Sequence, residues 1–369
     1  MKHLLPLVTL SFFGLACQSG LPILSDSSPS AWTHPLRSDS VACYGFGPYA
    51  WNNHVFVQVD SGSVGLRRGS DGLLLWSLTL PPGWLDDVWV LDEVYSTPTA
   101  LWMFHEQEVL RINPFSGQGQ YLSYPLGPNR WTTRMGYVED ETMYIPIYDA
   151  HSVSLWRGSF FTPWDSVFGY VFPPNEFGLL DGVCTWGEHG AATLRIWDAN
   201  NQLGATRLAR WDDASQRDFP LVQDMGIGLP ILQDDHRLFI PTLSSVFAIE
   251  KESDSLLWSY SLPFAWPIPG WLAMNQDLLC LNHEGQGVLL SAQGGQVLQT
   301  YSLQNTSWID RIRPGPLGVY AAWDRGLCQI TPYGWRKSHS HSSALAPNVA
   351  VLSMGVACRD NRFVYRLGP

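Results

Sequence analysis

Cysteines are the first side chains of this chain that could bind a metal or act as nucleophiles. Six are present, and the five that follow the N-terminal region are Cys43, Cys184, Cys280, Cys328 and Cys358. Their spacings match no zinc motif, and all five fall in predicted strands, where a small buried thiol is expected. A disulfide between Cys43 and Cys358 is the alternative for one pair. We therefore predict no metal site built from cysteine.

Histidine and carboxylate pairs give no catalytic arrangement either. His339 and His341 are two residues apart, as ligands on one face of a strand would be, but no third ligand accompanies them, which favours a polar surface loop. The aspartate pairs at 86–87, 212–213 and 234–235 lie in predicted turns, whereas a glycosidase needs two carboxylates that face each other across a substrate. No nucleophile elbow or phosphate-binding loop appears. The sequence predicts no catalytic residue, no cofactor and no metal.

The composition predicts the elements that position these side chains. Charged residues make up 15% of the 369 residues, against roughly 25% in a typical soluble domain. Aromatic residues reach 13%, with 18 tryptophans, and the chain has 33 glycines and 26 prolines. Few charges, many aromatics and many turn residues predict an all-β chain of short strands. The net charge of −11 argues against a nucleic-acid partner, which requires a basic face.

One pattern of strands recurs along the chain. Residues 64–76 and 246–258 share a succession of short apolar runs in which a tryptophan follows a valine by twelve residues. Aligning the most apolar strand of each unit gives eight centres. These are Val57, Met103, Tyr144, Thr185, Phe239, Cys280, Ala321 and Ala357. Four of the seven steps between them are 41 residues long, and a period of about 40 to 45 residues with four strands per unit indicates propeller blades.

Each unit predicts a four-stranded antiparallel blade. The fourth strand often opens with an aromatic ring that could fill the gap between blades, as at Trp76, Tyr121, Trp258 and Trp335. The last unit lacks a fourth strand, and residues 31–36 resemble the missing one. We predict that they pair with the C-terminal unit and close the ring, which removes exposed sheet edges. The expected fold is an eight-bladed β-propeller, with seven blades as the alternative if the third or fourth unit is not a blade.

The N-terminus has the features of a targeting segment. Residues 4–16 form an apolar run that is too short to span a bilayer comfortably, which is typical of a secretory signal peptide over residues 1–16. The run ends at Cys17 and resembles a bacterial lipobox, in which the cysteine is lipidated; an ordinary signal peptide is the alternative. By resemblance to Gram-negative sorting, Gln18 favours the outer membrane. Residues 17–30 predict a flexible tether, and residues 31–369 a single propeller domain.

The repeat resembles the quinoprotein-type (PQQ-like) unit, whose motif is similar to Ala-x-Asp-x-x-x-Gly-x-x-x-Trp. The local matches are residues 65–76 and 248–258, whereas the third, fourth and seventh units keep the motif poorly. WD40 repeats fit less well, because the Trp-Asp dipeptides at 197–198, 211–212 and 323–324 fall at different places in the unit.

The resemblance implies one of two functional classes. Quinoprotein dehydrogenases of this superfamily bind a quinone over calcium, are considerably longer, and often carry a disulfide between adjacent cysteines, a pair that this chain lacks. The other class includes the propeller lipoprotein of the outer-membrane β-barrel assembly machinery, a lipid-anchored eight-bladed scaffold of similar size. The signal segment, the size and the number of units favour the second class. No local motif carries that protein's partner-binding residues over to this chain.

The links between blades carry the candidate binding residues. In propellers these links lie on one face, around the channel mouth, where tryptophans could bind a partner's apolar side chains or stack on a sugar. An insertion around residues 211–219 predicts a surface loop on the same face. The candidates are Trp84, Trp131, Trp266, Trp271 and Trp308 in the links and Trp211, Arg217 and Phe219 in the insertion. Burial of the tryptophans between blades is the alternative.

The sequence therefore predicts an exported cell-envelope lipoprotein that faces the periplasm or the cell surface. Its expected role is that of a non-catalytic, monomeric propeller that acts as a scaffold for envelope proteins and meets the membrane only through a lipid on Cys17. The first alternative is a polysaccharide- or peptidoglycan-binding module. The second is a quinone-dependent dehydrogenase-like enzyme.

Overall fold

The computed structural model describes most of the chain. The described residues are 30–35, 47–85, 94–105, 107–132, 136–200, 203–212, 216–222, 230–242, 244–264, 270–303, 309–315, 318–323, 326–340, 350–353, 355–359 and 363–367. All regular elements in these ranges are β-strands, numbered β1 to β33. None of these residues belongs to a helix of the length and apolarity that would cross a bilayer.

The strands form eight antiparallel sheets, which we number as blades in chain order. Blade 1 holds β2–β5 (Tyr49–Trp51, His54–Asp60, Ser63–Arg68, Leu74–Thr79) and blade 2 holds β6–β9 (Tyr95–Ser96, Leu101–Phe104, Glu108–Ile112, Gly119–Ser123). Blade 3 holds β10–β14 (Trp131–Thr132, Tyr137–Glu139, Thr142–Tyr148, Ser152–Gly158, Asp165–Val171) and blade 4 holds β15–β18 (Phe177–Trp186, His189–Trp197, Leu203–Trp211, Gln216–Val222).

The second half of the chain repeats this arrangement. Blade 5 holds β19–β22 (Leu232–Gln233, Arg237–Pro241, Ser245–Glu250, Leu256–Ser261) and blade 6 holds β23–β26 (Gly270–Met274, Asp277–Leu281, Gln286–Leu290, Val297–Ser302). Blade 7 holds β27–β30 (Ile309–Gly315, Gly318–Trp323, Gly326–Thr331, Gly334–Ser340). The closing blade holds β31–β33 (Ala350–Leu352, Gly355–Arg359, Phe363–Leu367) and β1 (Ser30–Pro35).

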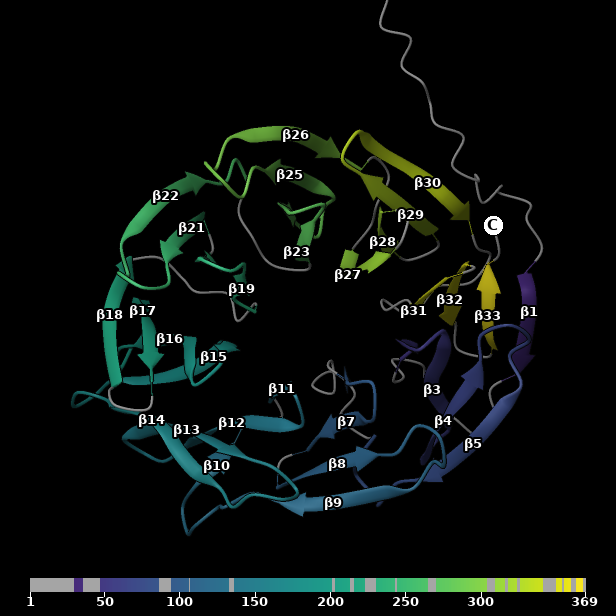
Figure 1. Cartoon of the computed structure of the whole chain (residues 1–369), viewed down its shortest axis with the longest axis horizontal. Helices are drawn as coiled ribbons and strands as arrows, with labels where there is room; N and C mark the ends of the chain where they lie inside the picture. Colours follow the sequence, from purple (N-terminus) through teal and green to yellow (C-terminus); the bar gives the residue numbers. More distant parts are fainter. Residues whose placement is uncertain are drawn as a thin grey trace, which may run out of the picture.

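The sheets follow one another around a ring, with strands such as β19, β23 and β31 nearest the centre and strands such as β9, β18 and β26 at the rim (Figure 1). Burial follows this order. In blade 2 every residue of β7 is buried, because neighbouring blades cover both faces of a middle strand, whereas the rim strand β5 of blade 1 alternates between exposed and half-buried residues. The prediction of an all-β propeller of four-stranded antiparallel blades is confirmed, and the third and fourth units each form a sheet of their own.

The two ends of the chain share one blade. Strand β1 pairs antiparallel with β33, with Thr33 opposite Tyr365 and Pro35 opposite Phe363. Figure 1 shows the two strands side by side at the rim, where β1 takes the place of a fourth strand. The prediction that residues 31–36 close the ring is confirmed. The closure leaves β33 with a partner on each side.

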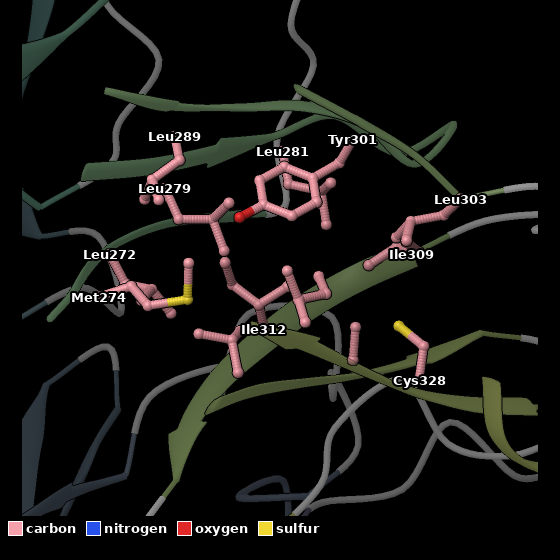
Figure 2. Close-up of a cluster of buried hydrophobic side chains, with 13 residues drawn as sticks. Leu272, Met274, Leu279, Leu281, Leu289, Tyr301, Leu303, Ile309, Ile312 and Cys328 are labelled. Carbon is pink, nitrogen blue, oxygen red and sulfur yellow. The ribbon is translucent and has the colours of Figure 1, made fainter. Parts of the chain in front are cut away.

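The hydrophobic core lies between blades. One cluster of buried side chains joins blade 6 to blade 7, with Leu279 and Leu289 from one sheet and Ile312 and Ile330 from the other (Figure 2). Because each sheet packs against its neighbours in this way, the stabilising apolar burial is divided among the blade-to-blade contacts.

Aromatic residues on the rim strands fasten blades together. Trp76 on β5 donates its indole Nε1–H to the carbonyl of Pro114 in blade 2, at 2.7 Å. Its ring also lies against Gly117, whose φ is +74°, so a side chain at that position would collide with the indole. Trp258 on β22 makes the same bond to Ala292 of blade 6, at 3.3 Å. The predicted interblade role of these two tryptophans is confirmed.

Blade 4 departs from the predicted alignment. Thr185 was expected in the second strand but lies in β15, the first strand of its blade. The strands of this blade are longer than most, with nine to ten residues in β15 to β17. A step of 41 residues from the preceding centre, Tyr144, therefore ends in the first strand of the blade and does not reach the second. The predicted insertion at 211–219 is therefore wrong as a loop: these residues lie largely in β17 and β18, which pair with each other.

A charged network also joins blade 2 to blade 3. Glu141, in the turn between β11 and β12, accepts hydrogen bonds from Arg111 Nε at 2.8 Å, Thr97 Oγ1 at 3.0 Å and Thr99 Oγ1. Burial acts to raise the pKa of the Glu141 carboxyl, but the bonds from Arg111 and the two threonines outweigh it and hold the pKa below its ordinary value.

This network predicts an acid-sensitive contact. A carboxylate whose pKa is lower in the folded than in the unfolded state stabilises the fold above its unfolded pKa of about 4.3, and this stabilisation is lost as the pH falls through the folded pKa. We expect Glu141→Gln to lower the free energy of unfolding by about 1 kcal/mol near neutral pH and by less at pH values of about 3. Urea unfolding at a series of pH values measures the difference. Glu188→Gln, which removes an exposed ion pair with Arg157, is the control and should change little.

Ring closure gives a second prediction. A chain that begins at residue 37 lacks β1 and exposes the edge of β33, so we expect it to unfold at a temperature several degrees lower and to self-associate. A synthetic peptide of residues 29–36 added in trans should restore both properties. Thermal unfolding and analytical ultracentrifugation measure them, with a chain that begins at residue 29 as the control. Equal behaviour of the two truncated chains would show that β1 contributes nothing to the ring.

Candidate functional site

The antiparallel sheets give the ring two faces with different contents. Because chain direction alternates from strand to strand, the starts of the first strands, the turns between second and third strands and the blade-to-blade links share one face, which we call the linker face. The turns between first and second strands and between third and fourth strands lie on the opposite face, which we call the turn face. The predicted tryptophans of the links belong to the linker face.

Three of the predicted binding tryptophans are buried. Trp84 is 2% exposed and stacks on His105 at 4.9 Å between ring centroids. Trp271 is 5% exposed and donates its indole N–H to the carbonyl of Pro230 at 2.8 Å. Trp211 ends β17 and is also buried. Their assignment as binding residues is wrong, because each ring is used in packing the blades, as the alternative interpretation held.

Apart from Trp131, the remaining predicted residues divide into two groups. Arg217 and Phe219 lie in β18, opposite Arg210 and Leu208 of β17, and so belong to a paired strand instead of a loop. The residues that lie outside the described ranges are Cys17, Cys43, Trp266, Trp308 and His341.

The cysteines that the structure describes in full are core residues. Cys184, Cys280 and Cys328 are buried and unbonded, and burial raises the thiol pKa of Cys184 and Cys328 to about 12. A thiol with so high a pKa carries no thiolate at neutral pH and is a poor nucleophile. The prediction of buried, inert thiols is confirmed for these three.

No cluster of metal-ligating residues forms within the described ranges, in the sense of three or more His, Cys, Asp or Glu side chains placed to hold one ion. The aspartate pair at 234–235 lies in the turn between β19 and β20. There Asp234 accepts hydrogen bonds from Arg237 and from the backbone N–H of His236. Burial acts to raise the pKa of the Asp234 carboxyl, but these bonds outweigh it and lower the pKa. This is the structural turn that the sequence predicted.

Among the predicted tryptophans that the structure describes, Trp131 is the one that is open to solvent. It begins β10 on the linker face, is 50% exposed, and stacks almost parallel on Tyr148 of β12, with 6.1 Å between centroids and 19° between planes. Tyr148 is itself buried. Its hydroxyl donates to the carbonyl of Leu180 at 3.1 Å and accepts from the N–H of the same residue at 3.0 Å. Trp131 therefore rests on a ring that is fixed to the next blade.

The next blade repeats this arrangement with residues that the sequence did not single out. Phe177 begins β15, is 44% exposed, and stacks on Trp197 of β16 at 5.8 Å and 14°. The guanidinium of Arg195 lies over the Trp197 ring at 5.2 Å. Phe177 follows a link of the same type, with Pro173 and Pro174, but this link carries no tryptophan, the residue type on which the prediction was based.

A carboxylate accompanies each of these two stacks. Asp149 directly follows Tyr148 and accepts bonds from the His151 N–H at 2.8 Å and the Ser152 hydroxyl at 2.7 Å, and these bonds lower its pKa. Asp198 directly follows Trp197 and accepts from the Asn200 N–H at 2.8 Å. Each blade thus presents an exposed ring, a second aromatic ring behind it and an aspartate held in a turn.

The turn face carries exposed aromatic side chains of a different kind. Phe115, Phe161 and Tyr333 lie in or beside the turns between third and fourth strands of blades 2, 3 and 7, and they are 74%, 82% and 91% exposed. They are the most exposed aromatic residues in the described part of the chain. Phe115 contacts Trp51 of blade 1 edge-to-face at 5.1 Å. A proline directly before Phe115 and Tyr333 is a sequence signal that could have marked these two tips.

The turn face also carries exposed acidic residues in blades 3 to 5. Asp140, Glu188, Asp235 and Glu252 are exposed in turns of blades 3, 4 and 5, on the turn face. Beneath them the cations are buried: Arg210 pairs with Asp254. Burial lowers the pKa of Lys251, whose ammonium lies over the ring of Trp186 at 4.9 Å. The surface potential of this part of the turn face is therefore negative.

Comparison with known proteins identifies the fold. No model of a known family and no curated protein matches the sequence. BamB from Moraxella catarrhalis is similar in structure with a TM-score of 0.58 and 10% identity, over 88% of this chain and 98% of that one. Sqt1 from Saccharomyces cerevisiae has a TM-score of 0.60 and 10% identity, over 92% and 99%. The computationally designed Ika8 protein has a TM-score of 0.61 and 11% identity, over 92% and 99%. At such identities the likeness shows that the chain shares the β-propeller fold of these three proteins.

Proposed function

We propose that this chain is a non-catalytic propeller lipoprotein of the cell envelope, whose turn face binds a protein partner. The observation that carries the proposal is the set of exposed aromatic tips, Phe115, Phe161 and Tyr333, on turns of one face. Aromatic residues are enriched among the side chains that contribute most to protein–protein binding, because one ring buries a large area while losing little conformational freedom.

The neighbouring charges select the chemistry of the partner. Phe115 and Phe161 lie on adjacent blades, and the exposed acidic residues Asp140, Glu188 and Asp235 continue the same face over blades 3 to 5. A surface that complements this region has apolar side chains bordered by lysine or arginine. Attraction between opposite charges increases the association rate constant. Salt screens this attraction, so the rate constant should fall as the salt concentration rises.

The envelope location rests on the first residues of the sequence. A signal segment over residues 1–16, Cys17 at its end and a Ser- and Pro-rich tether to residue 30 are the parts of an exported lipoprotein. The similarity to BamB, which is one of fold, is consistent with this proposal. A propeller held by a lipid on a tether can turn either face towards a membrane-bound partner.

The partner site is tested by removing the two adjacent rings. We expect the double variant Phe115→Ala/Phe161→Ala to weaken binding of the partner by about tenfold or more, since two buried anchors are lost. Affinity capture from detergent-solubilised envelopes identifies the partner, and surface plasmon resonance at low and high salt measures its affinity for each variant. The wild-type association rate should fall as salt rises.

Val171→Ala is the matched control for this experiment. Val171 ends β14 on the linker face and is 76% exposed, so its truncation removes exposed apolar area without touching the turn face. The control should bind like the wild type. Binding that is unchanged in the double variant, or equally weakened in Val171→Ala, would refute a partner site at the two phenylalanines.

The anchor is tested separately. We expect the mature protein from membrane fractions to carry the mass of a diacyl or triacyl group on Cys17, and Cys17→Ala to lose both this mass and its membrane association. Intact-mass spectrometry and cell fractionation measure the two effects. An unlipidated protein in the soluble fraction would contradict the anchor and would leave the turn-face site to be judged on its own experiment.

A further inference from the structure

Two adjacent blades of the linker face carry the same three-part arrangement. In blade 3 it consists of Trp131, Tyr148 and Asp149, and in blade 4 of Phe177, Trp197 and Asp198. In both, the exposed ring begins the first strand, the supporting ring ends the second strand, and the aspartate opens the turn that follows. A repeat of this kind, in blades whose sequences otherwise differ, points to a ligand that is itself repetitive.

Each exposed ring is a flat and rigid platform. The rings of Trp131 and Phe177 lie within 19° and 14° of parallel to the rings that support them, with 6.1 and 5.8 Å between centroids, so each pair forms an offset stack. The supporting Tyr148 is fixed by two hydrogen bonds to Leu180, and Trp197 is covered by Arg195 on β16. A platform that is already held in place loses little entropy when a ligand stacks on it.

The aspartates supply hydrogen-bond acceptors beside the platforms. A carboxylate can accept about four hydrogen bonds. Asp149 uses one on each oxygen for His151 and Ser152, which orient it and leave capacity for donors from a ligand. Hydroxyl groups are such donors. Stacking area combined with carboxylate acceptors is the chemistry that recognises a sugar ring, which has apolar C–H faces and hydroxyls around its edge.

The two platforms are close enough for one chain of sugars. Tyr148, on which Trp131 stacks, is bonded through its hydroxyl to Leu180, which lies three residues along β15 from Phe177, or about 10 Å. Once a linear oligosaccharide has stacked on one ring, its binding to the second ring is intramolecular. The overall affinity is therefore higher than that of either contact alone. Asp149 and Asp198 disfavour an acidic polymer, and the glycan that fits is uncharged.

We infer that the linker face of blades 3 and 4 binds an uncharged linear polysaccharide by stacking sugar rings on Trp131 and Phe177. This site is independent of the turn face, where the proposed protein partner binds. The sequence predicted a different binding site, formed by the tryptophans of the links. Two of these, Trp84 and Trp271, are buried, so the site inferred here takes the place of that prediction.

The test uses the mature protein and a panel of uncharged oligosaccharides of glucose, mannose, galactose and N-acetylglucosamine, each at increasing length. Isothermal titration should show binding to one sugar class with an affinity that rises with length until both platforms are spanned. Trp131→Ala and Phe177→Ala should each lower the affinity by about tenfold. Trp131→Phe, which keeps a ring, should retain most of it.

Two further variants separate this site from the turn face. Phe115→Ala/Phe161→Ala should bind the oligosaccharide like the wild type, and Trp131→Ala should retain the protein partner. Thermal unfolding of Trp131→Ala and Phe177→Ala should match the wild type, because both side chains are about half exposed. The inference is overturned by wild-type protein that binds no member of the panel, by binding that survives both alanine changes, or by a preference for acidic polysaccharides or proline-rich peptides.

Discussion

The side-to-side packing of neighbouring sheets is the interaction on which this molecule depends. A four-stranded sheet has two faces to cover, and here each face is covered by another blade, so the core consists of separate clusters such as the one between blades 6 and 7 (Figure 2). A row of sheets packed in this way always ends in two uncovered faces unless it returns on itself. The pairing of β1 with β33 completes that return, because a strand from residues 30–35 supplies the rim of the blade that the C-terminus leaves unfinished.

Packing of this kind also restricts where binding can occur. Both faces of the middle strands are used between blades, as the fully buried strand β7 shows, and what remains is the turns, the links and the rim. It explains why the tryptophans whose exposure the structure describes are buried or half-buried, with the exception of Trp131. Trp76 and Trp258 donate their indole N–H groups to the next blade, and Trp271 donates to Pro230. Trp131, which is 50% exposed and stacks on a ring of its own blade, differs from these residues and is therefore informative.

The sequence was sufficient for the repeat and for the closure, because both depend on the period of apolar strands. Seven of the eight predicted centres lie in the second strand of their sheets, and Thr185 does not, because the longer strands of blade 4 change the local period. The site was harder to predict. Trp84 and Trp131 both follow a proline-containing link, yet one is buried against His105 and the other opens a strand opposite Tyr148. Exposure depends on strand register and on the neighbouring blade, which composition and periodicity do not encode.

The two faces differ in the geometry of their aromatic side chains, and this favours different ligands for each. On the turn face Phe161 and Tyr333 project from tight turns, a shape that can enter an apolar recess on a partner protein. On the linker face Trp131 and Phe177 lie flat on other rings, a shape that receives a flat ligand. Middle strands of about five to nine residues separate the faces by about 15 to 30 Å, beyond the range of direct contact. Because the sheets between them are closely packed, we expect occupancy of one face to leave the other unchanged, so that the two proposed sites could be filled together.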